Sequence, residues 1–265
     1  MELTGALHKS PLIEASRERA LFRLDTVGRF LVRLGEPTVV QAAPGATDED
    51  VQCLLGGPVA ALRACLAGEF SLRGAAAEVG GRSLAVLGTA SGTSSLVAGL
   101  ALRGQRVVAD SVVCVTGEPP HVSPVRETTP GRVTLWPDSV EALGLDPAAG
   151  ERVRPGIASR SFAFGPPDPL SVPLGALVVL AIDYRLGSPG EIVVRRAMRP
   201  DAAVMRLLAG QWHHQLARDL GMRKEQFEWA ASLVAAAPPV RLYRAPGQIA
   251  STLPAVLEAA QGVLS

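Results

Sequence analysis

The stretch Leu84-Ala-Val-Leu-Gly-Thr-Ala-Ser-Gly-Thr-Ser-Ser-Leu96 decides the fold class of this chain. It begins with an apolar run of the kind that is buried on both faces of a sheet. A glycine-bearing turn follows from Gly88 to Gly92, and a helix is expected from Thr93. Phosphate-binding loops have this order of parts, because the N–H groups of the turn and of the helix N-terminus converge on one anion. The stretch therefore indicates either such a loop or an ordinary packing turn.

The spacing inside the turn departs from the usual phosphate-loop pattern, G-x-x-x-x-G-K-[ST]. Gly92 takes the second glycine position, and Gly88 is one residue too close to be the first. Thr93 stands where the lysine would reach the β- and γ-phosphates, and Ser94 stands at the position of the magnesium ligand. On spacing alone, a packing turn is favoured over a phosphate loop.

The segments around the turn predict an α/β fold with a mixed, partly parallel sheet. A helix is expected over 93–102 and a second apolar strand over 106–115, which completes a β-α-β unit. The last third of the chain is expected to be helical over 201–220, 224–235 and 249–264, with one strand over 240–243. We also expect 174–184 and 191–195 to pair as neighbouring strands.

Residues before the turn predict a smaller, β-rich region. Short strands are expected over 21–24, 29–34 and 37–41, followed by a helix that Gly56-Gly57-Pro58 must kink or split. Two further strands are expected over 70–72 and 75–79. We divide the chain into a poorly ordered tail (1–20), a small β-rich region with its helix (21–68) and a larger α/β domain (69–265).

Three runs around the turn carry a resemblance to a known family. They are Ala75-Ala-Ala-Glu-Val-Gly-Gly-Arg-Ser-Leu-Ala-Val-Leu-Gly88, Leu102-Arg-Gly-Gln-Arg-Val-Val-Ala-Asp-Ser-Val-Val113 and Val133-Thr-Leu-Trp-Pro-Asp-Ser-Val-Glu-Ala-Leu-Gly-Leu-Asp146. In this order they resemble the C-terminal catalytic domain of HPr kinase/phosphorylase over roughly 69–245. The shorter bacterial relatives, some of which phosphorylate a serine of a lasso peptide, are the most similar. The resemblance implies a P-loop-containing, HPr-kinase-like fold.

The resemblance also implies roles for individual residues. Asp110 matches the base that takes the acceptor proton, and Ser94 with Asp110 would hold magnesium. The implied nucleotide-binding set is Gly88, Ser91, Gly92, Thr93, Ser94 and Ser95. Three functional positions of the family are lost, because its lysine falls on Thr93, its second acid on Ser111 and its histidine on Arg73.

Arginines could compensate for the missing lysine, because guanidinium groups suit bidentate phosphate contacts. Of the 26 basic residues, only Lys9 and Lys224 are lysines. The candidate phosphate contacts are Arg73, Arg152, Arg154 and Arg160. In so arginine-rich a chain, solvated loop arginines are the simpler interpretation and are favoured.

Composition excludes several classes of protein. A net charge of +1 gives no electrostatic case for a nucleic-acid partner. Cys53, Cys65 and Cys114 are widely spaced, so neither a disulfide framework nor a zinc site is indicated. The adjacent His213 and His214 cannot chelate one metal from a helix and are expected to pack or lie on the surface. No signal peptide or membrane-spanning run is visible, which predicts a cytoplasmic protein with no membrane partner.

Two functional classes remain open. The first is a degenerate HPr-kinase-like protein, an accessory or pseudokinase that binds a peptide or small protein in a bacterial pathway. The second is an active serine kinase for a peptide or small protein, with ATP or GTP and magnesium as cofactors. The residue losses favour the first, since phosphoryl transfer depends on positioning and charge stabilisation around the γ-phosphate. A homo-oligomer is also open, because the family's full-length enzymes resemble ring-shaped assemblies.

Overall fold

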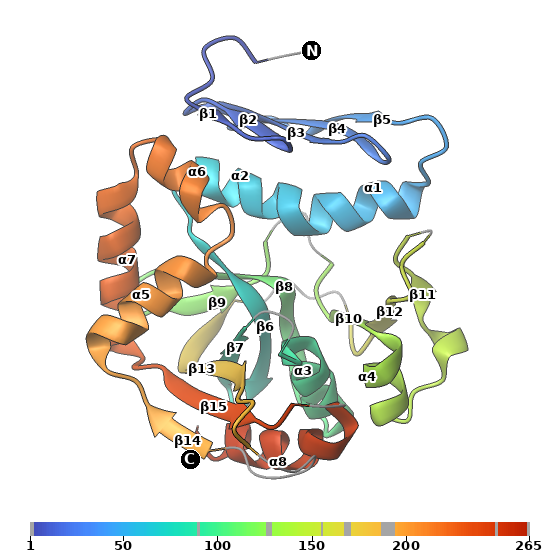
Figure 1. Cartoon of the computed structure of the whole chain (residues 1–265), viewed down its shortest axis with the longest axis vertical. Helices are drawn as coiled ribbons and strands as arrows, with labels where there is room; N and C mark the ends of the chain where they lie inside the picture. Colours follow the sequence, from blue (N-terminus) through green and yellow to red (C-terminus); the bar gives the residue numbers. More distant parts are fainter. Residues whose placement is uncertain are drawn as a thin grey trace.

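The computed structural model describes residues 3–88, 91–125, 129–154, 156–166, 171–186, 194–246 and 249–263. An antiparallel sheet lies at one end of the molecule, a helical layer lies beneath it, and a larger α/β body fills the rest (Figure 1). The structure is therefore mixed α/β, with a β-rich N-terminal region and helices in its C-terminal part, as the sequence predicts.

The N-terminal sheet is an antiparallel meander in the order β1-β2-β3-β4-β5. Its inward face, which carries Phe22 and Phe30, packs on the helices below. The strands are β1 (His8–Lys9), β2 (Ile13–Ala15), β3 (Arg19–Leu24), β4 (Gly28–Arg33) and β5 (Val39–Ala42). The expected tail over 1–20 is wrong for most of its length. Ile13, Ala15 and Ala20 are buried in this layer, and strands this short and this polar give little periodic signal.

The helical layer consists of α1 (Asp48–Leu54), the π-helical turn η1 (Leu55–Val59) and α2 (Ala60–Leu66). Thr47 caps α1 through a capping box with Asp50. The expected kink is confirmed at Gly57, whose φ of −117° and ψ of −106° are not helical. Pro58 follows directly, so the N–H that a regular helix would use there is absent.

The central sheet has the order β14-β15-β13-β7-β6-β8-β9 within the described residues. β7 and β15 run parallel to β13, whereas β6 runs antiparallel to both β7 and β8. The bounds are β6 (Ser71–Val79), β7 (Arg82–Leu87), β8 (Arg106–Thr116), β9 (His121–Ser123), β13 (Val172–Ile182), β14 (Val194–Ala197) and β15 (Val240–Arg244). The expected strands over 70–72 and 75–79 are one continuous strand.

The expected β-α-β unit is confirmed by β7, α3 (Thr93–Leu102) and β8. β6 lies between β7 and β8 and is antiparallel to each, so β7 and β8 run in the same direction. The crossover thus spans one intervening strand. The turn before α3 and the middle of β8 meet where the candidate site is found.

Helices cover both faces of the central sheet. α3, α4 (Pro137–Ala142) and α8 (Ile249–Gln261) pack on one face, and α5 (Pro200–Gly210) and α7 (Arg223–Ala236) on the other. Leu84 and Val86 of β7 belong to the first core and Ala85 and Leu87 to the second, which explains the uninterrupted apolar run.

Two expectations for the C-terminal third are wrong. β14 pairs with β15 and not with β13, because the parallel strand β15 inserts between them. The helix expected over 201–220 is divided into α5 and α6 (His214–Asp219) by a turn in which His213 has a φ of +52°. Local periodicity does not report such a turn, which is fixed by contacts with distant segments.

A small antiparallel sheet and one short helix flank the body beside α4. The sheet has the order β10-β12-β11, with β10 (Arg132–Leu135), β11 (Glu151–Arg152) and β12 (Arg160–Ala163), and the 3-10 turn η2 (Pro147–Ala149) precedes β11. Among the helices of the described segments, none combines the length and apolarity needed to cross a bilayer.

Candidate functional site

The turn after β7 is closely packed at its first glycine. The Gly88 N–H donates to the carbonyl of Arg73 at 3.4 Å. A Cβ on Gly88 would lie 2.2 Å from the Ser91 Oγ and 2.6 Å from the Leu180 carbonyl oxygen. Only glycine fits at this position, because the turn packs closely on β13. This packing explains the glycine whether or not an anion binds to the turn. Residues 89 and 90 lie outside the described segments.

The N-terminus of α3 has features that favour an anion. Gly92 is the N-cap in the left-handed region, with a φ of +98°, and no described side chain caps the helix. Within the described residues, the first-turn N–H groups therefore lack the side-chain acceptor that most helices provide. The Ser91 side chain is 3% exposed, and its hydroxyl has no hydrogen-bond partner within the described part of the chain. The expected residues Gly92 and Thr93 lie at this helix start.

The structure brings the predicted pair Ser94 and Asp110 together. The Ser94 Oγ donates to Asp110 Oδ1 at 2.7 Å. Asp110 Oδ2 accepts from the backbone N–H of Thr134 in β10 at 3.0 Å and from the Ser111 Oγ at 3.4 Å. One carboxylate thus joins the first turn of α3, the middle of β8 and the small flanking sheet.

Burial raises the pKa of the Asp110 carboxyl, and the hydrogen bonds from Thr134, Ser94 and Ser111 oppose that rise. A carboxylate with a raised pKa is a better proton acceptor near neutral pH than an exposed one. Ser111, which follows it, has a φ of +68°, a region that residues other than glycine seldom adopt. Strain of this kind often accompanies functional sites.

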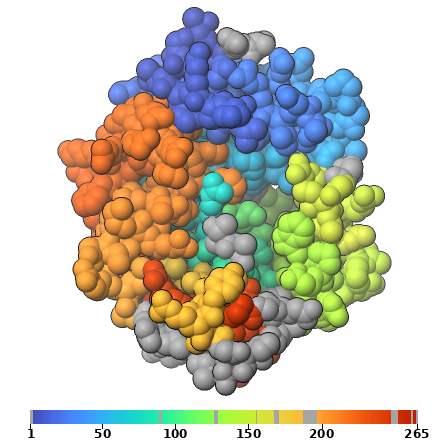
Figure 2. Space-filling model, viewed as in Figure 1, coloured from blue at the N-terminus to red at the C-terminus, as the bar shows by residue number. Residues whose placement is uncertain are grey.

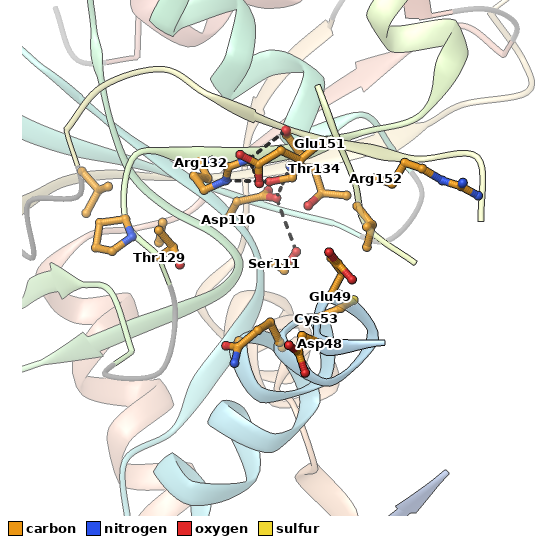
Figure 3. A pocket seen from close by; sticks show the side chains of 18 residues that line it. Asp48, Glu49, Cys53, Asp110, Ser111, Thr129, Arg132, Thr134, Glu151 and Arg152 are labelled. Atoms are coloured by element: carbon orange, nitrogen blue, oxygen red, sulfur yellow. Dashed lines mark hydrogen bonds and ion pairs between the residues drawn. The ribbon is translucent and has the colours of Figure 1, made fainter. Parts of the chain in front are cut away.

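A cavity of about 590 Å³ opens beside Asp110. α1 forms one wall, and the small flanking sheet with the segment after β11 forms the other. Figure 3 shows Asp48, Glu49 and Cys53 facing Asp110 and Ser111 across it. The described lining residues are Asp48, Glu49, Gln52, Cys53, Gly56, Gly57, Val108, Ala109, Asp110, Ser111, Thr129, Pro130, Arg132, Thr134, Glu151, Arg152, Val153 and Ser161. Figure 2 shows the molecular surface hollowed between the helical layer, the segment around residue 150 and the C-terminal helices.

The arginines of the cavity are partly held by neighbouring groups. Arg132 pairs with Glu151 at 2.8 Å and donates to the Ser161 hydroxyl at 3.0 Å. Arg152 lines the cavity from β11. Of the other predicted phosphate contacts, Arg160 donates to the Gly150 carbonyl at 2.8 Å. Arg154 lies close enough to Cys53 to lower the pKa of its thiol, although burial raises that pKa more strongly.

Two other predicted residues are used in packing. The Ser95 hydroxyl is buried and donates to the Ser139 hydroxyl at 2.8 Å, which joins α3 to α4. The Arg73 guanidinium lies 4.1 Å from the centre of the Trp212 ring, in cation–π geometry. Partial burial lowers the pKa of Arg73. Neither residue is among the described lining residues of the cavity.

Arg244 is a cation at the turn that sequence reasoning missed. It ends β15 and is 6% exposed, and its Nε donates to the Ser91 carbonyl at 2.8 Å. Burial lowers its pKa, while nearby Asp138 and Tyr184 raise it. Because β7, β13 and β15 are parallel, their carboxyl ends meet at one edge of the sheet, where ligands of α/β proteins bind. The position of Arg244 at the end of an expected strand was the signal available in the sequence.

The metal pair predicted from the resemblance has the right chemistry but too few ligands. A hydroxyl and a carboxylate are oxygen donors of the kind that Mg²⁺ prefers. In the described segments, no group of three or more His, Cys, Asp or Glu side chains could hold a metal. Ser94 and Asp110 therefore do not make a resident magnesium site without further ligands from a nucleotide and water.

Comparison with models of known protein families gives no match, and neither does comparison with curated proteins.

Proposed function

We propose that this chain is a degenerate HPr-kinase-like protein, a pseudokinase whose cavity binds a segment of a peptide or small protein. One observation carries the proposal. The cavity opens on Asp110, whose carboxylate accepts hydrogen bonds from Ser94, Ser111 and Thr134. The carboxylate is held as a structural junction at the floor of a cavity whose size is typical of ligand sites.

The charge around the turn argues against efficient phosphoryl transfer. Thr93 supplies no cation, and Ser111 supplies no second carboxylate. The nearby Arg244 donates from its Nε to a carbonyl of the turn. Loss of one preorganised donor typically costs about 10²–10³ in rate. Several such losses together leave little transition-state stabilisation, even though the effects are not additive.

The cavity wall suits a polypeptide with groups of both charges. Asp48 and Glu49 stand on the α1 side, and Arg132 and Arg152 stand on the opposite side. A peptide segment could present a basic side chain to α1 and a carbonyl or carboxylate to the arginines.

Nucleotide titration by calorimetry tests the pseudokinase half of the proposal. We expect no binding heat with millimolar ATP or GTP and magnesium. Micromolar affinity that is lost in Ser94→Ala would contradict the proposal and support the kinase. Ser123→Ala is the matched control, because this exposed hydroxyl donates to the Ser171 hydroxyl at 2.9 Å, away from the turn and Asp110.

Selection from a random peptide display library tests the binding half. Thr129→Trp adds a large side chain at the exposed lip of the cavity, and Thr116→Trp makes the same change at an exposed position outside the lining. We expect the selected peptides to bind the wild type and Thr116→Trp but not Thr129→Trp. Peptides that bind all three proteins equally would show that the cavity is not their site.

An active ATP- or GTP-dependent serine kinase is the second candidate, because Arg244 brings a buried cation to the turn and Asp110 keeps a raised pKa. If the protein is such a kinase, we expect transfer of the γ-phosphate from radiolabelled ATP or GTP to a serine of a selected peptide. Transfer should be lost in Asp110→Asn, which keeps the shape of the side chain and removes its basicity. If no label reaches any selected peptide, this candidate is wrong.

A further inference from the structure

The outer face of the N-terminal sheet carries four arginines in an unusual arrangement. Phe22 and Phe30 point into the core below, so the alternate residues of β3 and β4 lie on the opposite face. In the β3–β4 pairing, Arg19 stands directly opposite Arg33, and Arg23 stands directly opposite Arg29. We call Arg19, Arg23, Arg29 and Arg33 the arginine face.

Like charges directly opposite each other in an antiparallel pair are destabilising. Within the described residues, the four arginines differ in the partners that offset this repulsion. Arg23 pairs with the buried Glu14, and Arg33 pairs with the exposed Glu36 at 3.0 Å. Arg19 donates to the Thr4 carbonyl at 3.2 Å. The side chain of Arg29 is exposed and has no ion pair or hydrogen bond within the described residues.

Apolar side chains lie between and beside these arginines. Leu21 and Leu31 form the cross-strand pair between the two arginine pairs, and Val39 of β5 stands opposite Leu31. Leu21 is buried, so Leu31 and Val39 are the members of this apolar strip that a partner can reach. Val39 is 55% exposed, and β5 is the edge strand of this sheet among the described strands. Arginines around an apolar strip are typical of a protein–protein interface.

We propose that the arginine face, with the edge at β5, binds an acidic, amphipathic segment of another polypeptide. Carboxylates of the partner would meet the arginines and relieve the repulsion between them, and its apolar side chains would cover Leu31 and Val39. Phosphate groups of a nucleic acid would match the charge but leave the apolar strip uncovered. A lipid surface matches both the charge and the apolar strip, so it is separated from a polypeptide by the test below. An extended segment could also add a strand to β5.

This surface is separate from the cavity, since none of the four arginines is among its described lining residues. The N-terminal residues of the chain already cover part of the arginine face. The Leu3 N–H donates to Glu14 Oε2 at 2.7 Å, and Thr4 accepts from Arg19, so the N-terminal end lies on this side of the sheet (Figure 1). The half of the face near Arg29 and Val39 stays exposed.

Fluorescence anisotropy with a labelled 12-residue peptide of alternating Glu and Val tests the proposal. We expect binding that weakens as salt rises, and that weakens by about fivefold in the double variant Arg29→Gln/Arg33→Gln. The control Arg82→Gln/Arg223→Gln makes the same charge change at exposed arginines elsewhere and should bind like the wild type. Removal of the repulsion should leave the melting temperature of the double variant unchanged or higher, which separates lost binding from lost folding.

Three outcomes would overturn the proposal. The peptide could fail to bind at millimolar concentration, or the control variant could lose as much affinity as the arginine-face variant. Alternatively, vesicles of phosphatidylglycerol or a DNA duplex could bind through Arg29 and Arg33 while the acidic peptide does not, which would assign the face to another class of partner.

Discussion

The Trp212 Nε1–H donates a hydrogen bond to the Ser111 carbonyl at 2.9 Å. This bond ties the turn between α5 and α6 to the residue that follows Asp110. The neighbouring His213 has its Nε2 2.8 Å from the Pro58 carbonyl in the kinked turn η1, a wall of the cavity. Ser111 and His213 are also the described non-glycine residues with positive φ. The turn at 211–213 therefore holds both the floor and the wall of the cavity in place.

Trp212→Phe should loosen the floor of the cavity. The change keeps an aromatic ring under Arg73 but removes the donor to Ser111, so we expect a loss of about 0.5–1.5 kcal/mol in the free energy of unfolding. Chemical denaturation measures this loss. Trp136→Phe, at an exposed tryptophan, is the control and should change stability little. Equal stability of Trp212→Phe and wild type would show that the bond does not constrain Ser111.

His213 makes stability depend on pH. Burial lowers the pKa of this histidine from 6.5 to about 4. The unfolded chain takes up a proton as pH falls below about 6.5, whereas the folded chain does not until about pH 4. The contribution of His213 to the free energy of unfolding is therefore complete above pH 6.5. It is lost as the pH falls from about 6.5 to about 4, by at most about 3 kcal/mol.

His213→Asn should flatten this dependence, because asparagine tolerates the left-handed backbone and does not titrate. Denaturation between pH 4.5 and 7.5 gives the slope for the variant and the wild type. His214→Asn changes the exposed neighbour and should keep the wild-type slope. If both variants have that slope, the pH dependence arises elsewhere.

Much of the local structure could be predicted from the sequence, since it depends on near neighbours. The strand before Gly88, the helix over 93–102 and the kink at Gly57 follow from apolar pattern, glycine and proline. The resemblance paired Ser94 with Asp110 as magnesium ligands, and in the structure the two side chains are hydrogen-bonded. The resemblance supplied their proposed roles.

The rest of the site depends on long-range packing that periodicity does not encode. Arg244 is 153 residues from Ser91, and Trp212 is 101 residues from Ser111. Each contact requires the strand order of the central sheet and the break between α5 and α6. Sequence reasoning named Arg73 and Arg160 among the candidate phosphate contacts, but these side chains lie on Trp212 and at the Gly150 carbonyl.

Arg244→Leu should destabilise the turn. The Ser91 carbonyl loses its charged donor, so a cost of about 1–3 kcal/mol is expected from the unpaired acceptor. Thermal and chemical denaturation measure this cost. Arg241→Leu, three residues earlier on the same strand, is the matched control and is less buried. Arg244→Lys should recover part of the loss, because an ammonium group can still donate to a carbonyl. Full stability in Arg244→Leu would mean that the arginine is not needed to hold the turn.

Thr93→Lys tests whether the turn could still bind a triphosphate once its cation is restored. We expect no binding of ATP or GTP by calorimetry, because the turn remains one residue short. Gly88 is also packed against the Leu180 carbonyl and the Ser91 side chain, so the backbone has little room to reshape around phosphates. The variant itself should fold, since Thr93 is the first residue of α3 and is not fully buried. A second variant, Thr93→Lys with one glycine inserted after Gly88, lengthens the turn to the usual spacing. Affinity that appears only in this second variant would assign the defect to turn length, whereas tight binding by Thr93→Lys alone would show that the missing lysine was the whole defect.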